Sequence, residues 1–325
     1  GRASASSAAA PGEAAAARRP ALVLAHGFFG GKKVPVLPIE YFRGISQDLR
    51  EQGYDVLVTD VPSTSHVSAR AEALCEQIER WSERDGRRVA VMAHSMGGLD
   101  ARYAVSRLGG HDIVQTLLTI STPHRGSPVA DVLLRTSEAV GLSQLLEALP
   151  SKLLADMPDG GRCLTTAAAA EFNAEVIDRP EVTYLSVAGD RGSTLRTSPE
   201  LMATYYYMLS TEGPNDGLVS VASAQWGRYL HTIDMDHFHQ MNLPLPHRWV
   251  TGAPSYADVL LMYRKLAAEA AAGGDATQGP ALACSQPRTS RGAICRARGP
   301  CAENTAPSRR SEAPACYDLG GPQRL

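Results

Sequence analysis

Residues 88–105 constrain the fold of this chain more than any other stretch. An apolar run of β-forming residues occupies 89–93, and a helical pattern follows a short turn. Ser95 lies in that turn, with Ala93 and Gly97 two residues to either side. A strand that turns sharply into a helix needs small neighbours, because larger side chains would collide in the strained turn. The same turn lifts a serine hydroxyl clear of the sheet edge and places it near a helix N-terminus.

Apolar runs with strand and helix periodicity alternate along the chain. Strands are predicted at residues 21–25, 54–60, 89–93, 114–120, 182–188 and 229–235. Helices are predicted at residues 41–52, 68–83, 256–269 and from Leu99 onward. This alternation predicts an α/β fold, a mostly parallel sheet with helices on both faces. Ligands bind at the carboxyl ends of strands in such sheets, so Ser95 is a candidate nucleophile. The alternative is a serine in an ordinary strand-to-helix turn.

Length and charge limit the possible functions. A chain of 325 residues can form one large α/β domain with a full core. Its formal net charge of -2 gives no support for binding nucleic acid or an anionic membrane. The sequence lacks an apolar run long enough to span a bilayer. Of six cysteines, only Cys75 and Cys163 fall in the part expected to fold. The spacing of the other four, Cys284, Cys295, Cys301 and Cys316, indicates neither a zinc site nor a redox pair.

Composition divides the chain into segments. Residues 1–20, rich in alanine, are interpreted as a disordered linker or the remnant of a targeting segment. The catalytic domain is predicted to span 21–270. Within it, leucines at helical spacing over 125–165 indicate short amphipathic helices, a lid or a fixed cap above the strand ends. Residues 271–325 have the composition of a disordered, low-complexity tail.

A serine nucleophile requires a base that removes its proton and an acid that orients the base. In this kind of fold the expected order along the chain is serine, acid, histidine. Asp216 lies in a polar turn before an apolar run, and His237 follows the last predicted strand. We therefore predict Ser95, Asp216 and His237 as the catalytic residues. His239 is an alternative base and Asp190 an alternative acid.

Acyl transfer also needs backbone N–H donors for the oxyanion. Met96, the residue after the serine, is expected to supply one donor, and Phe28 in the glycine-rich turn after the first strand the other. The alternative for that turn is a phosphate-binding loop, but it lacks both common glycine-rich phosphate motifs.

Seven short motifs together resemble the bacterial triacylglycerol lipases, an α/β-hydrolase family. These motifs lie at residues 26–30, 40–45, 93–98, 122–127, 170–173, 215–219 and 236–237. The resemblance runs in register from about residue 21 to about residue 245. It implies an α/β-hydrolase fold with a helical lid, and a nucleophile, an acid, a base and two oxyanion donors at the positions predicted above, Ser95, Asp216, His237, Phe28 and Met96.

The resemblance also implies a structural calcium ion and, in some members, a disulfide. The family's calcium ligand is an Asp two residues after the catalytic histidine, whereas this chain has His239 there. Neutral imidazole is a poor ligand for a hard cation, so no metal or other cofactor is predicted. Ala222 occupies the region where those members place a cysteine, so we do not expect that disulfide.

These observations predict a serine ester hydrolase that cleaves acylglycerols through an acyl-enzyme, at a lipid–water interface. The alternatives are a carboxylesterase or acyltransferase for short soluble esters, and a catalytically silent lipid-binding protein. Family resemblance implies secretion, while the N-terminal composition also allows an organelle or the cytoplasm. The sequence gives no oligomeric state.

Overall fold

The structure is a computed structural model and describes residues 21–31, 40–84, 86–139, 157–246 and 251–275. All of them lie within one compact unit, Gly1–Gly279. No helix in these ranges is long and apolar enough to cross a membrane.

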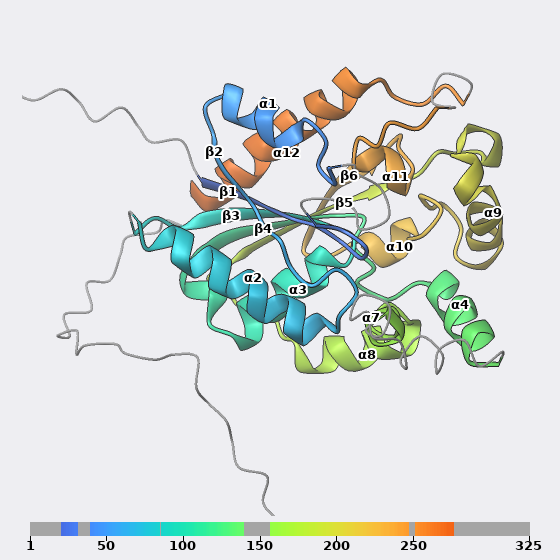
Figure 1. Cartoon of the computed structure of the whole chain (residues 1–325), viewed down its shortest axis with the longest axis horizontal. Helices are drawn as coiled ribbons and strands as arrows, with labels where there is room; N and C mark the ends of the chain where they lie inside the picture. Colours follow the sequence, from blue (N-terminus) through green and yellow to red (C-terminus); the bar gives the residue numbers. More distant parts are fainter. Residues whose placement is uncertain (1–20, 32–39, 85, 140–156, 247–250, 276–325) are drawn as a thin grey trace, which may run out of the picture. The chain divides into compact units, whose positions relative to one another are not determined.

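The centre of the fold is a parallel sheet of six strands in the order β2-β1-β3-β4-β5-β6 (Figure 1). The strands are β1 (Ala21–Ala25), β2 (Asp55–Val58), β3 (Val89–His94), β4 (Val114–Ile120), β5 (Thr183–Gly189) and β6 (Arg228–Ile233). The prediction of a mostly parallel sheet is confirmed, and every predicted strand is present. The central strands of the sheet are continuous apolar runs in the sequence because helices bury both faces of the sheet.

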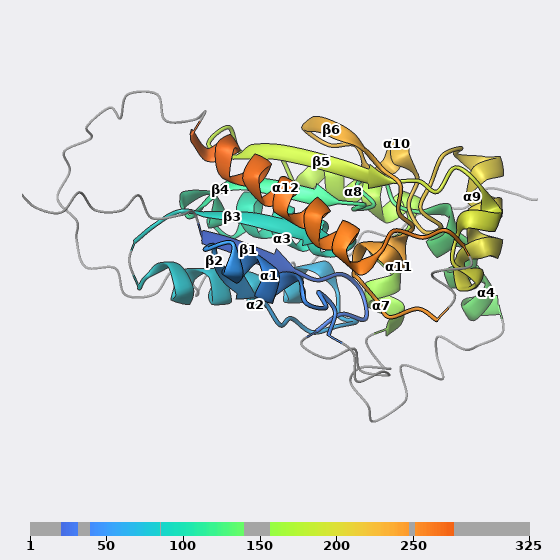
Figure 2. The ribbon, with the colours of Figure 1, turned by 90° about the horizontal axis from the view of Figure 1, so that it is seen from above.

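Helices cover both faces of the sheet (Figures 1 and 2). On one face, α1 (Ile45–Glu51) and α12 (Tyr256–Asp275) pack on side chains such as Leu24 and Met92. On the other face, α2 (Val67–Ser82) and α3 (Gly97–Arg107) pack on alternate side chains such as Val23 and Val91. The shorter helices are η1 (Gly110–Asp112), α4 (Pro128–Ala139), α7 (Met157–Arg162), α8 (Thr166–Glu175), η2 (Thr194–Arg196), η3 (Pro199–Leu201), α9 (Met202–Thr211), α10 (Val221–Ala224) and α11 (His237–Gln240).

Two helix boundaries differ from prediction. Residues 41–44 form a turn rather than the start of α1, because Gly44 takes a left-handed φ of 70°. Helix α12 continues to Asp275, beyond the predicted domain end at 270, and Ala270 is fully buried. Beyond residue 270, Gly273 is buried and its carbonyl oxygen accepts a hydrogen bond from the Thr183 hydroxyl of β5 over 3.1 Å, which holds the end of the helix on the sheet where composition alone indicated a tail.

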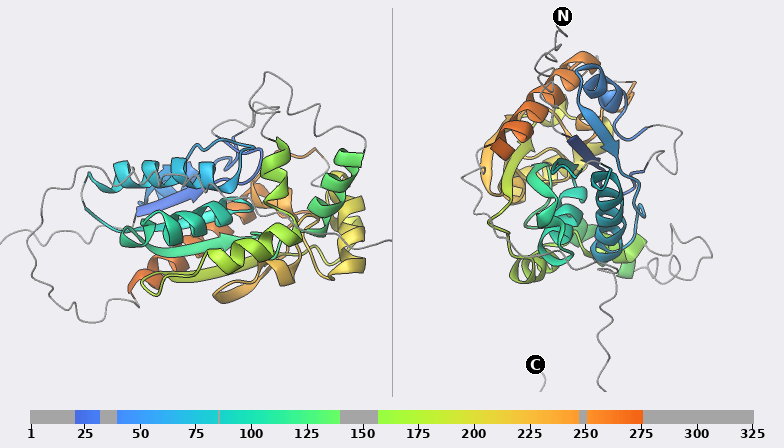
Figure 3. Two further views of the ribbon diagram at one scale, coloured as in Figure 1. Left: turned by 90° about the horizontal axis from the view of Figure 1, so that it is seen from below. Right: turned by 90° about the vertical axis from the view of Figure 1, so that its left-hand side faces the viewer.

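The region predicted as a lid, 125–165, is described only in part. Helices α4 and α7 lie near the carboxyl ends of the strands, with α9 beside α4 (Figure 3). Pro158 lies in the first turn of α7, where its missing N–H costs no helical hydrogen bond. Residues 140–156 lie outside the described part of the chain, so movement of this region stays a prediction.

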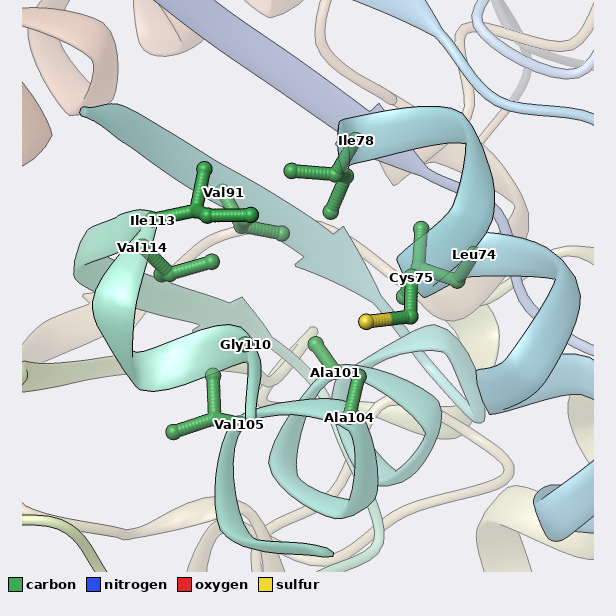
Figure 4. Close-up of a pocket in the computed structure, with 10 residues that line it drawn as sticks. All are labelled: Leu74, Cys75, Ile78, Val91, Ala101, Ala104, Val105, Gly110, Ile113 and Val114. Atoms are coloured by element: carbon green, nitrogen blue, oxygen red, sulfur yellow. The ribbon is translucent and has the colours of Figure 1, made fainter. Parts of the chain in front are cut away.

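A small apolar pocket lies between α2, α3 and the sheet (Figure 4). The Cys75 sulfur points into it, and side chains such as Leu74, Val91 and Ala101 line it. None of its lining residues belongs to the candidate site, so we interpret it as a packing defect between the layers.

Candidate active site

Ser95 follows β3 directly and takes a left-handed φ of 56°. This backbone conformation is uncommon for a residue with a side chain and marks a strained turn. Two glycines make the turn possible. A Cβ at Gly97 would lie 2.6 Å from the Ala25 carbonyl oxygen, and one at Gly98 would lie 2.1 Å from the Thr122 hydroxyl. The small residues seen in the sequence are therefore required by close packing beneath the serine.

The structure brings Ser95, His237 and Asp216 into one hydrogen-bonded row. The Ser95 Oγ lies 2.9 Å from His237 Nε2, and His237 Nδ1 lies 2.7 Å from Asp216 Oδ2. All three residues are buried, and Ser95 is 8 % exposed. A hydroxyl, an imidazole and a carboxylate in this order can transfer a proton from the serine to the imidazole.

The acid and the base are positioned by backbone contacts. Asp216 Oδ1 accepts hydrogen bonds from the N–H groups of Leu218 and Val219, which fixes the carboxylate in its turn. The His237 N–H donates to the Asp216 carbonyl oxygen over 3.0 Å. His237 is also the first residue of α11, whose N-cap is the Asp236 side chain. The loop after β6 therefore presents the imidazole at the carboxyl edge of the sheet.

The loop after β1 lies against the nucleophile. A Cβ at Gly27 would come within 2.7 Å of the Ser95 Cβ. Neither the Phe28 N–H nor the Met96 N–H has a hydrogen-bond partner among the described residues. Both predicted oxyanion donors thus lie on segments that adjoin Ser95.

A buried ion pair anchors this loop to the nucleophile helix. The Arg70 guanidinium lies 2.8 Å from the Asp100 carboxylate in the first turn of α3. Arg70 also donates to the carbonyl oxygens of His26, Pro62 and Ser63. Burial raises the pKa of Asp100 to about 6, although the Arg70 charge lowers it. Sequence reasoning missed this pair, and its signal was an arginine within the apolar pattern of the helix at 68–83.

The two alternative residues lie outside the row. Asp190 accepts hydrogen bonds from the Tyr205 hydroxyl and the Gly192 N–H. His239 Nδ1 lies 2.8 Å from the Asp236 carboxylate, and both side chains are fully buried. Neither residue contacts Ser95 or His237 in the hydrogen bonds and ion pairs of the described residues, so the geometry favours Asp216 and His237.

Residues at the family's calcium position do not fit that ion. His239 offers nitrogen where a hard cation requires oxygen, and the neighbouring Asp236 carboxylate accepts the Ser198 N–H and hydroxyl at 2.8 and 2.7 Å. Burial raises the pKa of Asp236, but its contacts with His239 and Ser198 outweigh burial and lower the pKa to about 2. The described residues contain no group of three or more His, Cys, Asp or Glu side chains that could hold a metal ion.

A further set of buried polar residues adjoins the row. Gln240 donates to Asp216, and His94 lies between Gln240 and Tyr41. Sequence reasoning did not assign these residues a role. The available signal was the position of Gln240, three residues after His237 and hence one helical turn away.

An apolar cluster begins at Met96, the residue that follows the nucleophile. Met96 and Leu99 are buried with Val67 and Cys163, and the partly buried Phe28 packs on this cluster. Burial raises the pKa of the Cys163 thiol to about 11. This cysteine is therefore neutral and forms part of the apolar cluster.

Sequence comparisons with known proteins identify relatives of this chain. A family model described as a PGAP1-like alpha/beta domain matches residues 66–141. Triacylglycerol lipase 2 of Saccharomyces cerevisiae is 33% identical over 221 residues, and the match spans 65% of this chain and 65% of the yeast protein. Triacylglycerol lipase of Vibrio cholerae is 30% identical over 258 residues, which cover 68% of this chain and 79% of that protein.

Solved structures show the same fold. Staphylococcus hyicus lipase superposes with a TM-score of 0.61 at 16% identity, covering 82% of this chain and 99% of that chain. A metagenomic carboxyl esterase superposes with a TM-score of 0.64 at 22% identity, covering 78% and 77% of the two chains.

The chain has the α/β-hydrolase fold, and its sequence matches to curated lipases show a carboxylic ester hydrolase of the lipase type. More narrowly, the extent and identity of the sequence matches place the chain in the triacylglycerol lipase family.

Proposed function

We propose that this protein hydrolyses carboxylic esters of acylglycerols with Ser95, His237 and Asp216 as its catalytic residues. The single observation that carries this proposal is the unbroken row of hydrogen bonds from the Ser95 hydroxyl to the Asp216 carboxylate, over 2.9 and 2.7 Å. The names of the yeast and Vibrio relatives, both triacylglycerol lipases, support the ester class.

In the first half-reaction, Ser95 Oγ attacks the ester carbonyl carbon while His237 Nε2 takes the hydroxyl proton. The Asp216 carboxylate stabilises the resulting imidazolium through Nδ1. His237 then gives the proton to the departing glycerol oxygen, which leaves an acyl-enzyme on Ser95. In the second half, a water molecule attacks the acyl group, again with His237 as the base, and the fatty acid is released.

Negative charge on the carbonyl oxygen requires donors that are oriented before the reaction. The N–H groups of Phe28 and Met96 are proposed for this role because they adjoin Ser95 and have no other partner among the described residues. Ser95 also precedes the N-terminus of α3, whose dipole favours negative charge there.

Apolar surface supports a lipid substrate. The cluster around Met96 and Leu99 gives the nucleophile an apolar wall. At the same end of the sheet, α4 exposes Leu133 and α9 exposes Tyr206, at 63 and 69 %. A site for a short soluble ester does not need such an extended apolar surrounding.

The test compares hydrolysis of emulsified long-chain triacylglycerol with hydrolysis of a short soluble ester. Wild type, Ser95→Ala and the exposed-site control Ser210→Ala are assayed together, and a fluorescent phosphonate reports the active serine. We expect Ser95→Ala alone to lose both emulsion activity and labelling.

Cleavage of the short ester only would overturn the acylglycerol substrate and favour a carboxylesterase. A folded wild type that neither cleaves esters nor reacts with the phosphonate would overturn the enzyme and favour a lipid-binding role. Activity that survives Ser95→Ala would overturn the mechanism.

A further inference from the structure

A chain of hydrogen bonds leads from the catalytic acid away from the serine. Gln240 Nε2 donates to Asp216 Oδ2 over 3.1 Å, and Gln240 Oε1 lies 3.1 Å from His94 Nε2. His94 Nδ1 lies 2.7 Å from the Tyr41 hydroxyl. His94 and Gln240 are fully buried, and Tyr41 is almost so. The His94 and His237 rings lie next to each other, with their centroids 4.6 Å apart.

Only one arrangement of protons satisfies this chain. An ionised Asp216 can only accept, so the Gln240 amide must direct its NH₂ group toward it. The Gln240 carbonyl oxygen then faces His94, whose Nε2 must carry a proton. Burial, together with the neighbouring His237, lowers the pKa of His94 well below its ordinary value. His94 is therefore neutral, and its Nδ1 accepts the Tyr41 hydroxyl proton.

We propose that Gln240 is a positioning residue that holds the Asp216 carboxylate and selects the Nε2–H tautomer of His94. With one nitrogen protonated and the other occupied by Tyr41, His94 has no lone pair for a proton from Ser95. Of the two adjacent imidazoles, only His237 can then act as the base. This inference rests on the proposed function of the same site.

The hydrogen bonds of this network are all directed toward the Asp216 carboxylate. Every donor in it points toward Asp216, from the Tyr41 hydroxyl through His94 to the Gln240 amide. Hydrogen bonds aligned in this way polarise one another and favour negative charge at the final acceptor. His94 contacts the Tyr41 hydroxyl and lies next to the His237 ring. The charged Asp216 is separated from His94 by the neutral Gln240 amide. An imidazolium at His94 would oppose the imidazolium that forms on His237.

The end of β5 is shaped to admit the Gln240 amide. A Cβ at Gly189 would lie 2.3 Å from Gln240 Nε2 and 2.9 Å from the Asp216 Cβ. Absence of a side chain at this position leaves the space in which the amide reaches the carboxylate. This is a separate observation from the hydrogen bonds, and it indicates the same role for Gln240.

The test uses Gln240→Met, which removes both hydrogen-bonding roles at similar length, and Gln240→Glu, which adds a charge. Exposed Gln47 on α1 provides the matched controls Gln47→Met and Gln47→Glu. Steady-state kinetics over a pH series on a soluble ester give kcat and KM. Phosphonate titration counts competent sites, and NMR of ¹⁵N-labelled histidine reports the His94 tautomer.

For Gln240→Met we expect kcat per competent site to fall about 10- to 100-fold with KM unchanged, the range for losing a hydrogen bond to a charged group. The His94 signal should change from one tautomer to a mixture. In Gln240→Glu the new carboxylate favours the imidazolium forms of both histidines, and its repulsion with the adjoining Asp216 raises the pKa of one of the two carboxyl groups, which moves the profile in the same direction. We therefore expect the acid limb of the pH profile to move up by about one unit or more.

Wild-type kcat and an unshifted pH profile in folded Gln240 variants would overturn the inference and leave the proposed function intact. A wild-type His94 with its proton on Nδ1 would overturn it as well. If Gln240→Met is unfolded, the pH profile of Gln240→Glu and the wild-type tautomer decide. Failure of the proposed function is distinct, because wild type itself would then lack ester hydrolysis and phosphonate labelling.

Discussion

The segment after β6 contributes to two buried His–Asp pairs, His237 with Asp216 and His239 with Asp236, and only the first of them faces the serine. His237 contacts Asp216 over 2.7 Å, and His239 contacts Asp236 over 2.8 Å. In the first pair the other ring nitrogen lies 2.9 Å from Ser95 Oγ. In the second pair, His239 Nε2 has no hydrogen-bond partner among the described residues.

Burial and a carboxylate partner therefore do not by themselves make a histidine a catalytic base. The role of each histidine depends on what its Nε2 atom faces. Asp236 caps α11 through the N–H groups of Phe238 and His239, so its pair fixes the helix that presents His237. The pair of His237 and Asp216 is thus placed to exchange a proton with Ser95. The pair of His239 and Asp236 fixes the position of α11, which carries His237.

Replacing the two histidines separately gives the largest contrast. We expect His237→Ala to lower kcat on the order of 10⁴- to 10⁶-fold, because Ser95 loses its base. His239→Asn should keep kcat in the wild-type range while it lowers the Tm. Kinetics and thermal unfolding measured on the same preparations check both. An equal loss of kcat in the two variants would contradict the assignment of His237 as the base.

The same two pairs separate the features that the sequence predicts from those that it does not. The six strands, the serine turn and the order of Ser95, Asp216 and His237 follow from local apolar periodicity and from motifs, which are written in neighbouring residues. The choice between His237 and His239 could not be made from periodicity, because it depends on which ring nitrogen faces a residue 142 positions away. Similarly, the network through Gln240 joins four separate segments of the chain and has no local pattern.

The two acids give the next contrast. Asp216→Asn keeps the shape of the side chain but can no longer stabilise the imidazolium, so we expect kcat to fall on the order of 10⁴-fold. Asp236→Asn weakens the cap of α11 and its contacts with Ser198, and should lower the free energy of unfolding by about 1–3 kcal/mol. Kinetics and urea unfolding at neutral pH measure the two effects. A loss of kcat confined to Asp236→Asn would reverse the assigned roles.

Acid unfolding separates the structural pair further. The pKa of Asp236 is lowered to about 2 in the folded protein, below its value of about 4 in an unfolded chain. Its ionised form therefore stabilises the fold above about pH 4, and this contribution of about 2.5 kcal/mol disappears as the pH falls through about 2. Urea unfolding of wild type and Asp236→Asn between pH 2 and 5 should show their difference in stability shrinking toward low pH. A constant difference would contradict the contact-lowered pKa.

A metal chelator should have the smallest effect of all. The loop after β6, which carries both histidines, is already joined to two other segments by a cation of the chain itself, the fully buried Arg191. Its guanidinium donates to the carbonyl oxygens of Arg196, Asp234, Thr251 and Gly252. We therefore expect EDTA to change neither kcat nor Tm, and Arg191→Gln to lower the Tm by several degrees.

Calcium added back after EDTA serves as the control for that measurement. A fall in Tm with EDTA that calcium reverses would mean that the loop after β6 holds an ion in spite of His239. If EDTA has no effect and Arg191→Gln lowers the Tm, these loops are fastened by side-chain charge. The guanidinium then does what a bound cation would do, since it gathers carbonyl oxygens from three segments around one positive group.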